Sequence, residues 1–90
     1  MPVAVDPTGQ QMVQVPSRID FLLRSAAAVA VTMPATAADM VMRVMITTVD
    51  PRLLNLLSSA LVASDAGDHI AAHRWVQRAI DYRDQRRAGR

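Results

Sequence analysis

The segment that most restricts the fold is residues 37–49, AADMVMRVMITTV, because its strongly polar side chains are confined to one narrow line. Asp39, Arg43 and Thr47 follow one another at intervals of four residues, and most other positions are apolar. A helix with this pattern has to be covered on nearly its whole circumference. Because a four-element domain can hardly supply that cover alone, the sequence predicts that this helix also contacts a partner.

A helix is predicted over residues 17–31. Ser17 is placed to cap it, and Asp20 lies in its first turn, where a carboxylate favours the helix dipole. Asp20 is also four residues before Arg24, the spacing of an intrahelical ion pair. Pro34 is expected to end the helix, because proline has no N–H group to continue it.

The later helices have their own capping residues. Thr36, with Asp39 three residues on, repeats the capping pattern at the start of the apolar helix. Asp50 followed by Pro51 predicts the start of a third helix, since proline suits the first helical position. The break at residues 64–67 then leads to Asp68, the expected cap of a fourth helix.

The N-terminal segment, residues 3–15, has a different pattern. Its apolar residues alternate with other residues, as they do in a half-buried strand. The tetrapeptide Asp6–Gly9 has the residue order of a type I turn. The segment therefore predicts a β-hairpin, and because an isolated hairpin is marginal in water, its strands need a neighbour.

The expected fold class is all-α: a small four-helix domain over residues 17–90, preceded by an N-terminal β-hairpin or extended arm over residues 1–16. The 90 residues allow one domain. The chain has no cysteine, which fits a cytoplasmic protein. The uncharged stretch 25–38 is broken by Pro34 and preceded by two aspartates, so neither a signal peptide nor a membrane span is expected.

The formal net charge is +2, with every cation an arginine and every anion an aspartate. The charge is uneven, because four arginines crowd the C-terminal end: Arg83, Arg86, Arg87 and Arg90. Beyond Tyr82, Arg83, Arg86 and Arg87 fall on the side of the fourth helix that is apolar before it. This part of the helix is expected either to fray or to project beyond the core.

The last two helices, residues 53–82, carry a partial family resemblance. Gly67 in the connecting turn, followed by Ala72 and Ala79 seven residues apart, resembles the turn and second helix of a tetratricopeptide repeat. Ser59, Ala60 and Ala63 depart from that family's first helix. The resemblance implies a protein-binding role without catalysis.

Catalytic and metal-binding patterns are weak in this chain. His69 and His73 are four residues apart on one helix, a spacing that can seat a metal, but no third ligand is near in the sequence. Ser58 and Ser59 lie within a helix, without the glycine-rich turn that presents a nucleophilic serine. We therefore expect no enzyme activity from the chain alone, and no cofactor.

The polar face of the fourth helix suggests nucleic-acid binding as an alternative. Four side chains there could reach phosphates or base edges: His73, Arg74, Gln77 and Arg78. Nearby aspartates oppose them, and a solvated face with Asp–Arg pairs is the competing interpretation.

We expect a non-catalytic protein–protein interaction or assembly protein, either a homo-oligomer or a small subunit of a larger complex. The residues predicted to form its interface are Val3, Val5, Val13, Val15, Met40, Met42, Met45 and Trp75. The alternatives are a dimeric DNA-binding regulator that reads with the fourth helix and an accessory subunit of a multi-chain enzyme.

Overall fold

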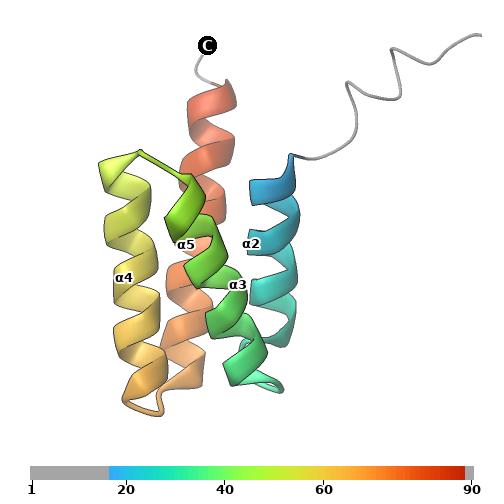
Figure 1. The fold of residues 1–90 in the computed structure, drawn as a ribbon, viewed down its shortest axis with the longest axis vertical. Helices are drawn as coiled ribbons and strands as arrows, with labels where there is room; N and C mark the ends of the chain where they lie inside the picture. Colours follow the sequence, from blue (N-terminus) through green and yellow to red (C-terminus); the bar gives the residue numbers. More distant parts are fainter. Residues whose placement is uncertain (1–16, 89–90) are drawn as a thin grey trace, which may run out of the picture.

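A computed structural model of the chain describes residues 17–88, which form four α-helices joined by short connections (Figure 1). The helices are α2 (Arg18–Val29), α3 (Pro34–Thr47), α4 (Pro51–Asp65) and α5 (His69–Ala88). No strand occurs in this described part, so the all-α prediction is confirmed for it. The predicted hairpin at 3–15 lies outside the described residues.

Consecutive helices run in opposite directions and close into a four-helix bundle (Figure 1). α2 packs on α3, α3 on α4 and α4 on α5, and α5 returns to contact α2. This is the up-and-down arrangement that short connections favour. One end of the bundle therefore gathers the start of α2, the end of α3, the start of α4 and the last part of α5.

The start of α3 differs from the prediction. Pro34 opens α3, three residues before the expected start, and the N-cap position is held by Met33, which makes no side-chain capping bond. Proline fits there because the first helical N–H groups have no intrahelical acceptor in any case. Thr36 and Asp39 therefore lie inside the helix, and Asp39 instead pairs with Arg43 at 3.0 Å.

The predicted caps of α2, α4 and α5 are confirmed. The hydroxyl of Ser17 accepts the N–H of Asp20 at 3.1 Å. The carboxylate of Asp50 accepts the N–H groups of Arg52 and Leu53 at 3.0 and 3.3 Å. Asp68 accepts the N–H of Ala71 at 3.0 Å, which fixes the start of α5.

The turn between α4 and α5 depends on Gly67, whose φ of +84° lies in the left-handed region. The N–H of Asp68 reaches back to the carbonyl of Ala63 at 2.9 Å, and the N–H of Gly67 reaches that of Ser64 at 3.0 Å. This pair of bonds is a Schellman motif. It reverses the chain tightly enough for α5 to pack along α4.

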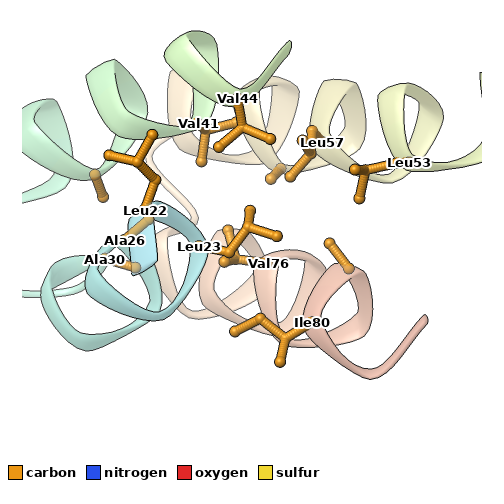
Figure 2. Packing of buried hydrophobic residues seen from close by; sticks show 13 residues of the cluster. Leu22, Leu23, Ala26, Ala30, Val41, Val44, Leu53, Leu57, Val76 and Ile80 are labelled. Atoms are coloured by element: carbon orange, nitrogen blue, oxygen red, sulfur yellow. The ribbon is translucent and has the colours of Figure 1, made fainter. Parts of the chain in front are cut away.

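The core is aliphatic and built largely from small side chains (Figure 2). Its largest fully buried members are Leu23, Leu53, Leu57, Val44 and Val76. Alanines fill the closest approaches between helices, and each is at least nine-tenths buried: Ala26, Ala30, Ala37, Ala60, Ala72 and Ala79. Small residues let the four helices come close, so the bundle is narrow and leaves part of each helix outside the core.

Candidate functional site

The outer face of α3 exposes large apolar side chains. Met42 is 46% exposed, Ile46 83%, and Val49, just beyond the end of the helix, 93%. Met42 and Ile46 are four positions apart, so they lie on one line along the helix, and Val49 follows them in the extended connection after Thr47. The inner face of α3 is buried through Ala37, Val41 and Val44. The expectation that α3 carries more apolar surface than one bundle can cover therefore holds for the described residues.

A groove of about 370 Å³ runs beside this line, between the start of α2 and the end of α3. It is lined by Arg18, Ile19 and Leu22 from α2 and by Arg43, Ile46 and Thr47 from α3. Phe21, 61% exposed, lies one helical turn from Arg18 on the outer side of α2. We call Met42, Ile46 and Val49, together with this groove and Phe21, the α2–α3 face.

The predicted interface residues fall into three groups. Met42 lies on the α2–α3 face, whereas Met40, Met45 and Trp75 are partly buried against the bundle's own core. The four valines of the N-terminal segment, Val3, Val5, Val13 and Val15, lie outside the described residues. Periodicity alone did not single out Ile46 and Val49, because it cannot tell which side of an all-round apolar helix its neighbours cover.

A second feature is the ionic cluster at the end of the bundle where α2 begins. Asp20, 5% exposed, is the only buried charged residue among residues 17–88. Arg83 donates to it at 2.9 Å and Arg87 at 2.7 Å, and the hydroxyl of Ser17 donates at 3.0 Å. Burial alone would raise the pKa of Asp20, but the bonds from Arg83 and Ser17 and the attraction of Arg83 hold this pKa below its ordinary value.

These contacts correct the prediction for Asp20 and reject one of the two alternatives for the end of α5, which was expected either to fray or to project beyond the core. Asp20 pairs with α5 and not with Arg24, whose guanidinium instead contacts Asp84 at 3.3 Å. α5 stays helical to Ala88, because Arg83 and Arg87 hold its last turns against the start of α2. Arg83 and Arg87 thus have an acidic partner on another helix. The pattern within a single helix cannot predict such a contact.

A similar set of contacts joins α4 to α5. The hydroxyl of Tyr82 donates to Asp50 at 2.7 Å, and Arg86 donates to the Tyr82 oxygen at 3.0 Å. The Tyr82 bond, helped by the backbone N–H groups of Leu53 and Arg52, lowers the pKa of Asp50. The hollow of about 180 Å³ beside Asp50, Arg83, Arg86 and Arg87 is therefore lined by both signs of charge, and its guanidinium groups already have acidic partners.

The polar face of α5 is divided by its contacts. Nδ1 of His73 lies 2.8 Å from the carbonyl of Ala27, to which it can donate a hydrogen bond, so this ring joins α5 to α2. Gln77 bonds Asp81 at 3.4 Å. Arg78 lies over the Trp75 ring at 4.8 Å and is exposed, as is Arg74. Of the four predicted nucleic-acid contacts, Arg74, Gln77 and Arg78 are therefore exposed to solvent, whereas His73 is partly buried against α2.

Within residues 17–88, no three His, Cys, Asp or Glu side chains lie close enough together to hold a metal ion. None of the four helices described has the length and apolar character needed to cross a membrane. Comparison of the chain with known protein families, curated proteins and solved structures finds no match. The resemblance of residues 53–82 to a tetratricopeptide unit stays a prediction.

Proposed function

We propose that the chain is a non-catalytic assembly protein that binds a protein partner through the α2–α3 face. The observation that carries the proposal is the exposure of Ile46 and Val49, at 83% and 93%, next to an apolar groove. Scattered exposed aliphatic residues are ordinary on protein surfaces, but several near one another in the chain and next to a groove are typical of a binding surface. The fold itself does not need them, because its core is already closed on the other side of α3.

The free energy available from this face is sufficient for association. Fully burying one large aliphatic side chain stabilises by about 1.5–3 kcal/mol. Met42, Ile46, Val49 and Phe21 together offer several kcal/mol, to which the groove residues add. Because association itself costs at least about 4 kcal/mol, binding requires most of the face to be covered at once.

The groove begins where the N-terminal segment joins the bundle. Ser17 caps α2, and the next two residues, Arg18 and Ile19, line the groove. Because residues 3–15 are joined to the bundle through Ser17, their effective concentration for the face is high. We propose that the predicted strands of this segment contribute to the same assembly surface, where pairing or packing would supply the neighbour that a hairpin needs.

Site-specific photo-cross-linking in cells that produce the chain tests this proposal. A photoreactive amino acid replaces Ile46 in one variant and Val62, an exposed valine of α4, in the matched control. We expect covalent adducts from position 46 and few or none from position 62. Equal adduct formation at the two positions, or none at position 46, would falsify the proposal that the α2–α3 face is the interface.

A further inference from the structure

We infer that the partner on the α2–α3 face is a second copy of this chain, with the two α3 helices packed antiparallel about a two-fold axis at Met42. The inference rests on the proposed function and names the partner. It depends on the order of exposed side chains along the outer side of α3, on the charged residues next to them and on the area that a stable dimer needs.

The outer strip of α3 consists of small residues at one end and large ones at the other. Its helical members are spaced three or four residues apart: Ala35, Ala38, Met42 and Ile46. Ala35 is exposed and Ala38 partly so. The strip therefore continues the line of Met42 and Ile46 toward the start of the helix, with decreasing side-chain volume.

An antiparallel copy matches this order with itself. When Met42 lies opposite Met42 of the second copy, Ala38 lies opposite Ile46, and Ala35 lies level with the connection that follows Thr47 of the second copy. On both sides of the axis a small residue then faces a large one, so the two helices can pack at an even separation along the strip. A two-fold interface uses the same patch on both subunits and requires such self-complementarity. In a parallel pair, by contrast, the alanines would face alanines and leave a gap.

The charges at the edge of the strip fit the same arrangement. The strip itself carries no charge, and Asp39 and Arg43, which pair at 3.0 Å, lie along the edge nearest the groove. A two-fold axis at Met42 places the Asp39–Arg43 edges of both α3 helices on the same side of the interface. Asp39 of each copy then lies within one turn of Arg43 of the other, so opposite charges meet and no carboxylate is buried alone.

The area of the α2–α3 face can be compared with the area that a stable dimer buries. The helical strip from Ala35 to Ile46 covers 12 positions, about 18 Å of helix at 1.5 Å per residue. A specific interface buries about 800 Å² on each partner, which is more than a single helix seam of this length provides. The edge with Asp39 and Arg43 is the one toward α2, so the same axis brings Phe21 and the groove of both copies to one side of the seam. The rest of the α2–α3 face thus extends the area beyond α3 alone.

Cysteine cross-linking of the purified full chain tests the arrangement, because the chain has no cysteine of its own. Under mild oxidation, Met42→Cys should form a covalent dimer, and Val62→Cys, on α4, should stay at the mass of one chain. A mixture of Ala38→Cys and Ile46→Cys should give the mixed dimer in preference to either self-paired one. Circular dichroism of each variant checks that it is folded, and the unmodified chain should have a dimer's mass in light scattering.

Two results would overturn the inference. One is an unmodified chain that stays monomeric at 100 µM, roughly a hundredfold above a micromolar dissociation constant. The other is a dimer in which Ala38→Cys and Ile46→Cys each pair only with themselves, which is the signature of parallel packing. Adducts at position 46 in cells would still support the proposed function, with another partner in the first case and with a parallel second copy in the second. Their absence would refute that function as well.

Discussion

Replacing Asp20 by asparagine tests the ionic cluster that holds α5 against α2. The change keeps the shape of the side chain and removes the charge that Arg83 and Arg87 bind at 2.9 and 2.7 Å. A hydrogen bond to a charged group contributes about 1.5–3 kcal/mol. The Arg83 bond should have this value, since the Arg83 side chain is only 24% exposed, but the half-exposed Arg87 contributes less than about 1 kcal/mol.

We therefore expect Asp20→Asn to lower the free energy of unfolding by about 2–3 kcal/mol, measured by urea denaturation at pH 7. For a domain of this size, the melting temperature should fall by roughly 10–20 °C. Asp84→Asn is the matched control, because Asp84 also contacts two arginines, Arg24 and Arg87, but on an exposed surface. It should cost less than about 1 kcal/mol. Equal losses in the two variants would refute the assignment of Asp20 as the buried anchor.

The difference between the wild type and Asp20→Asn should depend on pH. Because the folded-state pKa of Asp20 is lowered, its contribution is fully present above the unfolded-state pKa of about 3.9 and is lost as the pH falls through the folded-state value. The two proteins should thus differ most above about pH 5 and converge in stronger acid. A stability difference that stays constant down to pH 2 would contradict this origin.

Three further predictions concern other parts of the chain. Deleting residues 1–15 leaves Ser17 to cap α2, so the helical circular dichroism should be retained while association weakens; an unchanged mass and melting temperature would show that the segment plays no part in assembly. Arg74→Ala with Arg78→Ala should not change assembly, and the wild type should show no DNA binding at low salt; binding that the double variant weakens, with a flatter salt dependence, would support the DNA-binding alternative. Gly67→Ala should cost about 1 kcal/mol in urea denaturation, because the added Cβ meets no neighbour and only the left-handed backbone opposes it; a cost near zero would contradict the strain assigned to this turn.

The four helices could be predicted from the sequence because their starts and stops depend on local chemistry. Ser17, Asp50 and Asp68 cap their helices with bonds to backbone groups two or three residues away. Pro34 shows the limit of this reasoning, since proline both stops a preceding helix and suits the first turn of the next. In the structure α2 already ends at Val29, so Pro34 starts α3 and does not stop α2.

The candidate site could be predicted only in part, because it depends on which helices become neighbours. The amount of apolar surface on α3 pointed to an interface, but choosing Ile46 and Val49 over Met40 and Met45 as its exposed residues required the positions of α2 and α4. The partnership of Asp20 with Arg83 and Arg87 spans more than 60 residues of sequence. Helical spacing predicted Arg24 as the partner of Asp20, because spacing within one helix carries no information about contacts between helices.

The molar mass of two charge variants tests the assembly account most directly. Ile46→Lys and Val62→Lys each place a lysine in the last turn of a helix at an exposed aliphatic position, where a cation favours the helix dipole, so both should stay folded. Light scattering at low and high salt should give the wild type and Val62→Lys twice the 9.8 kDa mass of one chain, and Ile46→Lys that of a monomer. An Ile46→Lys protein that keeps the wild-type mass, or a wild type that is monomeric throughout, would contradict the account in which the α2–α3 face joins two copies.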